Sequence, residues 1–130
     1  MAHPNEDLAR GANAAFGRGD LGALQSQFFA EDIRWHVSGR GALAGDYEGV
    51  AKVMQLLGRI FELSGGTARI ELHDVLANDD HTVTLAANHA ERAGKQYRDN
   101  LVPVIHVQGG KAAEVWTHPA DPYAAAEFWS

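Results

Sequence analysis

Histidine is the residue type whose number and positions in this sequence point most directly to chemistry. The chain has seven histidines in 130 residues. Five of them fall in segments with the pattern of strands, namely His36, His73, His89, His106 and His118. A neutral imidazole titrates near pH 6.5, so it takes up or releases a proton readily at neutral pH. These positions predict general acid–base chemistry wherever the side chains face a common pocket.

The alternation of side chains along a strand indicates which histidines share a face. If the apolar residues of the strands after residue 69, such as Leu72 and Leu85, face inward, His89 continues the inner face and His73 points outward. His118 has the parity of Trp116. The strand that carries His106 is apolar on both sides, so its parity leaves the face of His106 open.

We expect His36 to act as the base, with His118 or His89 as the acid or as a donor that orients the substrate. Asp121 is a further candidate acid, because it could reach back towards His118. A structural role is the alternative for each of them. Histidines in a sheet often make hydrogen bonds to neighbouring backbone groups or are exposed at a dimer face. An Asp before Pro122 is what a helix N-cap requires.

Five further residues are candidates for binding a substrate. Trp116, Phe61 and Phe128 would supply apolar walls, although an aromatic residue in a strand more often packs than binds a ligand. Tyr47 would donate a hydroxyl at the pocket mouth, or would fix the helix that follows it. Asn100 would offer a polar group, since it and its neighbour Asp99 have opposite parity and one of them faces inward, unless both sit in water near a strand end.

Several kinds of site are not expected. The chain has no cysteine, which excludes disulfides, thiolate nucleophiles and Cys-ligated metals. A histidine metal site needs about three converging ligands, and no His-x-x-x-His pair occurs on an expected helix, so we predict no metal. The sequence has no phosphate loop, no Gly-x-Ser-x-Gly elbow and no dinucleotide fingerprint, so we predict no cofactor.

Composition favours one soluble domain over residues 1–130. The apolar fraction of 45% suffices for a core, and the length suits one domain. The net charge is −6 with scattered basic residues, so no surface for nucleic acid is expected. No apolar run reaches the roughly 18 residues that span a bilayer. The N-terminal residues lack the order of a signal peptide, so a cytoplasmic location is expected and membrane binding is not.

The pattern of helix and strand signals predicts an α+β fold. Helices are expected after Pro4 and across residues 21–28, then a short strand over residues 33–37. A Gly-rich loop over residues 39–49 and a strongly periodic helix over residues 50–61 follow. Four strands joined by short turns come next, with Pro103 at a bulge or a free amide, and Asp121 begins a short C-terminal helix. Strands grouped after helices favour an antiparallel sheet, and bulges and glycines would curve it around a hollow.

Three stretches resemble one known family. They are Gly19-Asp20-Leu21, the run from Phe28 to Asp32, and Gly110-Lys111 leading to Glu114-Val115-Trp116. With the order of elements, they make nearly the whole chain similar to the nuclear transport factor 2-like superfamily, and within it to the branch of SnoaL-like polyketide cyclases and ketosteroid isomerase-like proteins. The resemblance implies a cone-shaped, curved antiparallel sheet wrapped by N-terminal helices, a cystatin-like α+β barrel with a short C-terminal helix. It also implies a homodimer through the open sheet face.

The resemblance supports the fold and its pocket more strongly than it supports any particular reaction. It places His36 where ketosteroid isomerases have their base. Ala12 and Ile105, however, stand where those enzymes have the Tyr and the protonated Asp of the oxyanion hole. Thr117 stands where many SnoaL-like cyclases have an Asp. The resemblance therefore implies a pocket without implying steroid isomerase chemistry.

Three functions remain open. The first is a cofactor-independent acid–base enzyme of the cyclase, isomerase, dehydratase or epoxide hydrolase type, acting on a polyketide-like or other apolar metabolite. The second is a non-catalytic protein that binds or sequesters a metabolite. The third is a dimerisation module with a vestigial pocket.

Overall fold

The N-terminal helices form where the sequence supplies caps. In the computed structural model, which describes residues 2–130, helix α1 spans Pro4–Gly17, and the side chain of His3 accepts a hydrogen bond from the N–H of Asn5. Helix α2 spans Leu21–Ala23, and the carboxylate of Asp20 accepts from the N–H of Ala23. The chain then continues into a π-helical turn, η1, over Leu24–Phe28. The short second helix that was expected therefore forms, but it widens at its C-terminal end.

The two remaining helices confirm the sequence patterns. Helix α3 spans Val50–Leu63 and buries Val53, Leu56 and Leu57, which recur at helical spacing. Helix α4 spans Pro122–Trp129, and the carboxylate of Asp121 accepts from the N–H of Ala124. A proline directly after an acidic N-cap starts the helix as expected.

Six strands form one sheet in the order β2-β1-β6-β5-β4-β3. Their bounds are β1 Phe29–Val37, β2 Gly45–Glu48, β3 Arg69–Ala77, β4 His81–Arg92, β5 Lys95–Gln108 and β6 Lys111–Pro119. Strands β1 and β6 run parallel, and the other neighbours are antiparallel. Two expectations are corrected, since β1 begins four residues before residue 33 and the Gly-rich segment contains strand β2.

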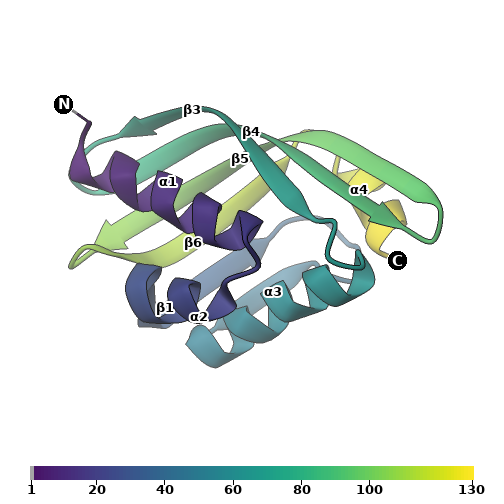
Figure 1. Ribbon diagram of the computed structural model, residues 1–130, viewed down its shortest axis with the longest axis horizontal. Coiled ribbons are helices and arrows are strands. Elements are labelled where there is room, and N and C mark those ends of the chain that lie inside the picture. The colour runs from purple at the N-terminus through teal and green to yellow at the C-terminus, as the bar shows by residue number, and fades with distance from the viewer. Residues whose placement is uncertain (1) are drawn as a thin grey trace.

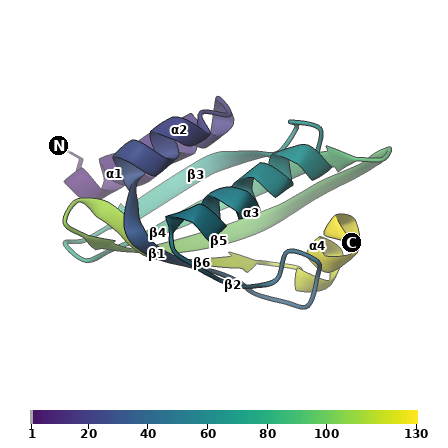
Figure 2. The ribbon, with the colours of Figure 1, turned by 90° about the horizontal axis from the view of Figure 1, so that it is seen from below.

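The sheet curves and carries α1, α2 and α3 on one side (Figures 1 and 2). The register shifts within β1, within β3 between Leu72 and Asp74, and between His106 and Val107 of β5, and such irregularities bend a sheet. Pairing between β4 and β5 is interrupted around Pro103, which has no N–H to donate. The expected α+β class with a curved sheet, N-terminal helices and a short C-terminal helix is confirmed.

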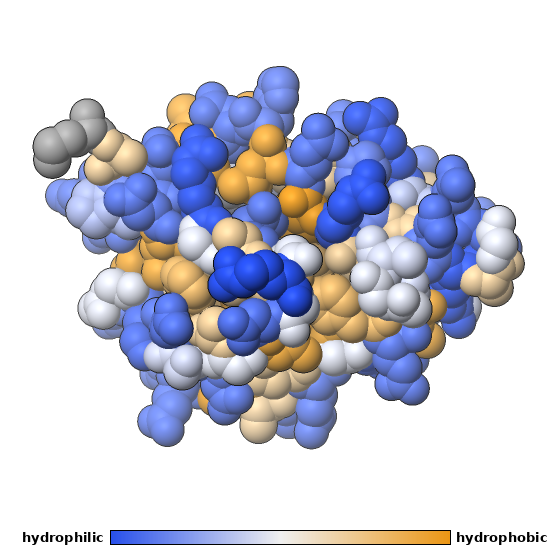
Figure 3. Space-filling model, in the orientation of Figure 1, coloured by the Kyte–Doolittle hydropathy of each residue, from blue (hydrophilic) through white to orange (hydrophobic). Residues whose placement is uncertain are grey.

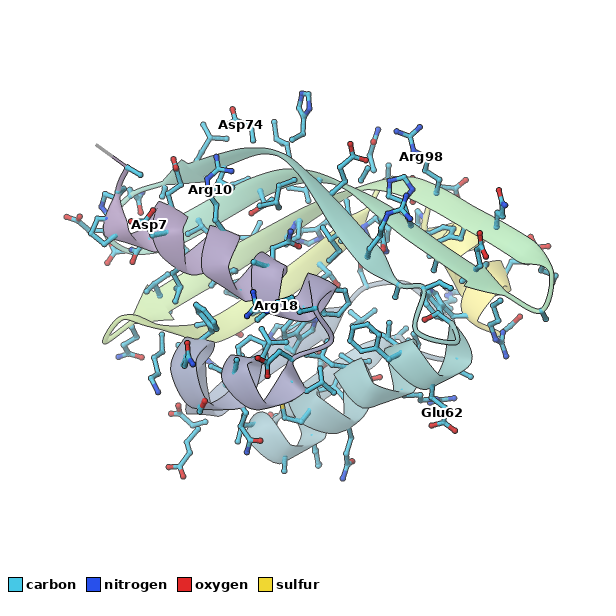
Figure 4. All side chains as sticks on the ribbon, in the orientation of Figure 1. Asp7, Arg10, Arg18, Glu62, Asp74 and Arg98 are labelled. Atoms are coloured by element: carbon cyan, nitrogen blue, oxygen red, sulfur yellow. The ribbon has the colours of Figure 1, made fainter. Side chains whose placement is uncertain are left out.

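The face that carries the three helices is called the inner face below, and the opposite face the outer face. In β4 the inner side chains are small or polar, since Thr82, Thr84 and Ala86 are buried whereas Leu85 is 39% exposed. The expectation that Leu85 and His89 face inward is therefore wrong. In β5, the even-numbered residues lie on the outer face, and Arg98 points away from α1 and α3 (Figure 4).

Polar side chains surround patches of apolar surface on the face that carries α1 and α3 (Figure 3). Within residues 2–130, none of the helices combines the length and the apolarity needed to cross a bilayer. The apolar residues instead form a core between α1, α3 and the sheet, centred on Ile33 and Val53, which are fully buried.

Candidate functional site

A cavity with two lobes lies between the inner face of the sheet and the helices. The first lobe has a volume of about 100 Å³ and lies beside α1 and η1. The second has a volume of about 130 Å³ and lies beside α3 and α4. Five residues line both lobes, namely Phe16, Trp35, Ile70, Leu101 and Thr117. The lobes are therefore neighbouring parts of one apolar interior.

The first lobe is lined almost entirely by hydrocarbon. Its walls include Leu8 and Ala12 of α1 and Phe28 of η1, facing Pro103 and Ile105 of β5. Its polar lining residues are Asn13, Thr84 and Thr117. The amide of Asn13 donates to the carbonyl of Ile70 at 3.1 Å, and the hydroxyl of Thr117 donates to the carbonyl of His36 at 3.2 Å. Two of the three polar groups are thus committed to the backbone.

The second lobe is closed by the segment between β1 and β2 and by α4. Leu43 of that segment and Trp129 of α4 both line the lobe and are buried. A Cβ at Gly41 would lie 2.7 Å from the Cα of Ala126, so only glycine permits this close approach of the segment to α4. The amide of Asn88, which also lines this lobe, makes no side-chain hydrogen bond to any residue of the described chain. It is therefore free to orient a polar atom of a ligand.

Tyr97 and Asp99 form a polar pair at the end of the second lobe. The Tyr97 hydroxyl donates to Oδ2 of Asp99 at 3.2 Å, and the N–H of Asp121 donates to the same oxygen at 2.9 Å. Burial, and then the nearby Asp99 carboxylate, raise the pKa of Tyr97 far above its ordinary value. Tyr97 therefore remains protonated at neutral pH, and it is a donor rather than a base.

Titratable groups are otherwise absent from the lining of the two lobes. Within the part of the chain that the structure describes, no His, Asp, Glu, Lys or Arg side chain lines either lobe. A cavity of this kind excludes water and binds apolar groups, but it offers no histidine for proton transfer.

His36 lies on the outer face, between two carboxylates. Its Nδ1 is 2.6 Å from Oδ1 of Asp46 on β2, and its Nε2 is 2.6 Å from Oε2 of Glu114 on β6. The ring stacks on Trp116 with 5.7 Å between centroids. Arg34 donates to the other oxygen of Glu114 at 3.1 Å. This group, Arg34, His36, Asp46 and Glu114, is called the His36 cluster below.

The two contacts determine the ionisation of His36. A carboxylate only accepts hydrogen bonds, so an imidazole that contacts one at each nitrogen must donate from both and carry a positive charge. The hydrogen bond to Asp46, followed by that to Glu114, raises the pKa of His36 above its ordinary value of 6.5. A protonated ring without a free lone pair cannot act as a base, so the cluster ties β2, β1 and β6 together instead.

The other three candidates for catalysis also lie outside the cavity. His118 is exposed on the outer face of β6. The Nε2 of His89 is 3.1 Å from Oε2 of Glu71 on β3, also on the outer face. Asp121 is exposed and caps α4. The structure does not bring the three together with His36 around a pocket.

The five candidates for substrate binding are divided between the two sides of the sheet. Trp116 stacks on His36, and Asn100 is exposed elsewhere on the outer face, opposite Ala87 of β4. Tyr47 donates its hydroxyl to the carbonyl of Leu43 at 2.7 Å and so supports the segment that closes the second lobe. Phe61 packs on Phe16 with 4.8 Å between centroids, and the buried Phe128 stacks on Tyr97 at 5.1 Å. Phe61 and Phe128 therefore lie directly behind lining residues.

Sequence reasoning missed the residues that line the cavity, among them the polar or aromatic residues Trp35, Asn88, Tyr97 and Thr117. A signal was present for two of them. Trp35 has the opposite parity to His36, so a base at His36 and a wall at Trp35 could not face the same pocket. Tyr97 has the same parity as Leu101 on the same strand, and Leu101 is buried, so both side chains face inward.

This chain is similar to a family model, to relatives in sequence and to solved structures. Residues 9–115 match the family model described as the SnoaL-like domain. The protein Rv0034 of Mycobacterium tuberculosis, described as uncharacterized, is 38% identical over 125 residues, which cover 95% of each chain.

Two solved structures illustrate the likeness. Bal32a, from a soil-derived mobile gene cassette, superposes with a TM-score of 0.93 at 34% identity and covers 98% of this chain and 97% of its own. An NTF2-like protein of Burkholderia xenovorans superposes with a TM-score of 0.79 at 24% identity, with coverage of 100% and 98%. The expected SnoaL-like domain is confirmed, and the chain shares its fold with an NTF2-like protein.

Proposed function

Because the chain belongs to the SnoaL-like domain family, whose fold here encloses an apolar cavity, we propose that it binds a small, flat, apolar molecule in the two lobes. The observation that carries the proposal is the lining itself, which is hydrocarbon and aromatic with a few amides and hydroxyls. Pockets of that chemistry hold apolar ligands and use their polar groups for orientation. This is the metabolite-binding function among those that the sequence left open.

The size of the lobes sets the size of the ligand. An apolar cavity of roughly 150 Å³ lined by Leu, Ile and Phe stays dry and admits benzene. Lobes of about 100 and 130 Å³ therefore each suit about one ring or a short branched chain, and together a fused two-ring compound.

The energetics support measurable binding. An empty apolar cavity costs about 24 cal/mol per Å³, so lobes of about 100 and 130 Å³ cost about 2.4 and 3.1 kcal/mol. A ligand that fills both lobes recovers on the order of 5 kcal/mol, which corresponds to a dissociation constant on the order of 0.1 mM. Orientation by Asn88 would add to this affinity.

Tryptophan fluorescence tests the proposal directly, because the three tryptophans are divided between the two sides of the sheet. Trp35 and Trp129 line the second lobe, whereas Trp116 lies on the outer face. Toluene is a suitable non-fluorescing probe at the excitation wavelength of tryptophan. The expected result is a saturable change in emission that persists in Trp116→Phe and is reduced in Trp35→Phe.

The converse pattern contradicts the proposal. If the change were lost in Trp116→Phe and kept in Trp35→Phe, toluene would bind the outer face. If toluene produced no saturable change up to its solubility, the lobes would not be a binding site.

The Tyr97–Asp99 pair favours a second candidate, acid–base chemistry without a cofactor. Tyr97 lines the second lobe and remains protonated, so its hydroxyl can turn from Asp99 to the carbonyl oxygen of a ligand, and a ligand that reaches past Tyr97 would meet the freed Asp99 carboxylate as a proton acceptor. This candidate keeps the isomerase or cyclase type of reaction that the sequence suggested and transfers it from His36 to Tyr97 and Asp99.

Exchange of α-protons distinguishes an enzyme from a binder. We would incubate 1-indanone, a flat two-ring ketone, with the protein in D2O and follow the α-CH2 signal by NMR. Exchange above the buffer rate that is lost in Tyr97→Phe and Asp99→Asn supports catalysis, and exchange at the buffer rate while 1-indanone binds identifies a non-catalytic binder. Exchange that survives both changes but not His36→Gln would return the base to His36.

A further inference from the structure

His81 and His106 form a pair on the outer face that the cavity does not use. They are directly opposite one another on the antiparallel strands β4 and β5. Their ring centroids are 4.9 Å apart, with 46° between the ring planes. Within residues 2–130, neither ring makes a hydrogen bond or an ion pair. Two imidazoles are thus held side by side with their nitrogens free.

The spacing of the rings is that of two imidazoles on one metal ion. A Zn–N bond is about 2.0–2.1 Å and the ring centre lies about 1.1 Å behind the nitrogen, so each centroid lies about 3.2 Å from the ion. An N–Zn–N angle between about 90° and about 110° then separates the two centroids by roughly 4.5–5.2 Å. The observed separation of 4.9 Å falls inside this interval.

The backbone beneath the pair is fixed. Thr82 and Ile105, the neighbours of the two histidines, are themselves paired across the strands, and Thr82 is fully buried. The N–H of Val107 donates to the carbonyl of Asp80 at 2.8 Å, which closes the end of the ladder beside the pair. Because this backbone is fixed, little order has to be created when an ion binds.

The surroundings favour a cation. The protein has a net charge of −6, and Glu114 is directly opposite His106 on β6. Glu114 already accepts from Arg34 and His36, so it offers no bond to the ion. Within residues 2–130, no group of three or more His, Cys, Asp or Glu side chains is close enough to hold an ion, so water must complete the coordination of an ion bound here.

We propose that His81 and His106 form a surface chelate for a divalent transition metal ion, with the two imidazoles as protein ligands and open positions on the solvent side. The ions suited to imidazole are Zn²⁺, Ni²⁺ and Cu²⁺, and not Mg²⁺ or Ca²⁺, which prefer oxygen ligands. This site is separate from the apolar cavity, since both rings lie on the opposite face of the sheet. The open positions would accept a donor atom from another molecule.

Isothermal titration with Zn²⁺ at pH 7.5 tests the proposal. We expect one saturable site with a dissociation constant in the micromolar range, and at least about tenfold weaker binding in both His81→Asn and His106→Asn. The matched control is His118→Asn, which removes an exposed histidine from the same face and should leave the affinity unchanged. His3→Asn is a second control, because His3 contacts Asp79 in the turn just before His81.

A melt without metal shows that each variant is folded, and the increase in melting temperature on adding Zn²⁺ gives a second readout. The proposal is overturned if the wild type binds no Zn²⁺ below about 1 mM, or if binding survives in both His81→Asn and His106→Asn. It is also overturned if His118→Asn or His3→Asn reduces the affinity as much as the substitutions in the pair.

Discussion

Filling the first lobe from within the protein is the sharpest perturbation that the cavity allows. Ala12 of α1 lines this lobe, and the helix backbone accepts leucine readily. Ala12→Leu adds three carbons at about 0.8 kcal/mol for each one buried, or about 2.4 kcal/mol at most. An empty lobe of about 100 Å³ costs about the same, so the substitution removes most of that penalty.

Strain reduces the gain, because added carbons force neighbouring side chains away from their preferred rotamers at a cost of about 1 kcal/mol or more. We expect Ala12→Leu to raise the free energy of unfolding by about 1 kcal/mol and to weaken, at least about tenfold, the binding of toluene in the first lobe. Urea denaturation measures the first effect and the tryptophan fluorescence titration measures the second.

Ala14→Leu is the matched control, since Ala14 lies on the exposed side of the same helix. It should change the free energy of unfolding by no more than about 0.5 kcal/mol and should leave the affinity for toluene unchanged. The reasoning is refuted if Ala12→Leu destabilises the protein by more than about 2 kcal/mol, because the lobe would then not be empty space. It is refuted equally if toluene binds in the first lobe of Ala12→Leu as tightly as in the first lobe of the wild type.

Three further predictions concern other parts of the molecule. Because its partners raise the pKa of His36, His36→Gln should lower stability by about 1 kcal/mol at pH 5.5–6.5, and the loss should shrink as the pH rises through the folded-state pKa; urea melts across pH measure it. A Cβ at Gly11 would lie 2.8 Å from the ring of Phe28, so Gly11→Ala should move that ring into the first lobe and weaken toluene binding in the fluorescence titration. We also propose the homodimer through the outer face, in which the second copy would face the open positions of an ion at His81 and His106, and Val104→Asp should shift sedimentation from dimer to monomer.

Each of these predictions has its own control. A stability difference for His36→Gln that grows with pH would mean that the ring is neutral in the folded protein. Gly58→Ala in α3 meets no atom within 4 Å and should leave toluene affinity unchanged. Gln55→Asp adds the same charge on the exposed side of α3 and should leave sedimentation unchanged, and a wild type that sediments as a monomer would exclude the dimer.

Local sequence patterns predicted those parts of the fold that depend on interactions within a few residues. The repeat of Val53 and Leu57 predicted α3, and Asp121 before Pro122 predicted the start of α4, because periodicity and capping act within a few residues. The parallel pairing of β1 with β6 joins residues about 80 positions apart, as in Arg34 with Glu114, and no local pattern shows it.

The candidate site was harder to predict, because the inner and outer faces of the strands were assigned from the hydrophobicity of their residues. In β4 the larger apolar residues, Val83 and Leu85, lie on the outer face, and the inner face has Thr84 and Asn88, which leave room for the cavity. The environment of His36 depends on β2, a strand inside the segment expected to be a loop. Its chemistry was therefore assigned without the carboxylates that hold it.

A crystal structure of the protein soaked with toluene would show whether an apolar ring occupies the two lobes. We expect electron density for the ring inside the first or the second lobe, in contact with Phe16 and Trp35, which line both. Density on the outer face beside Trp116, with both lobes empty, would contradict it.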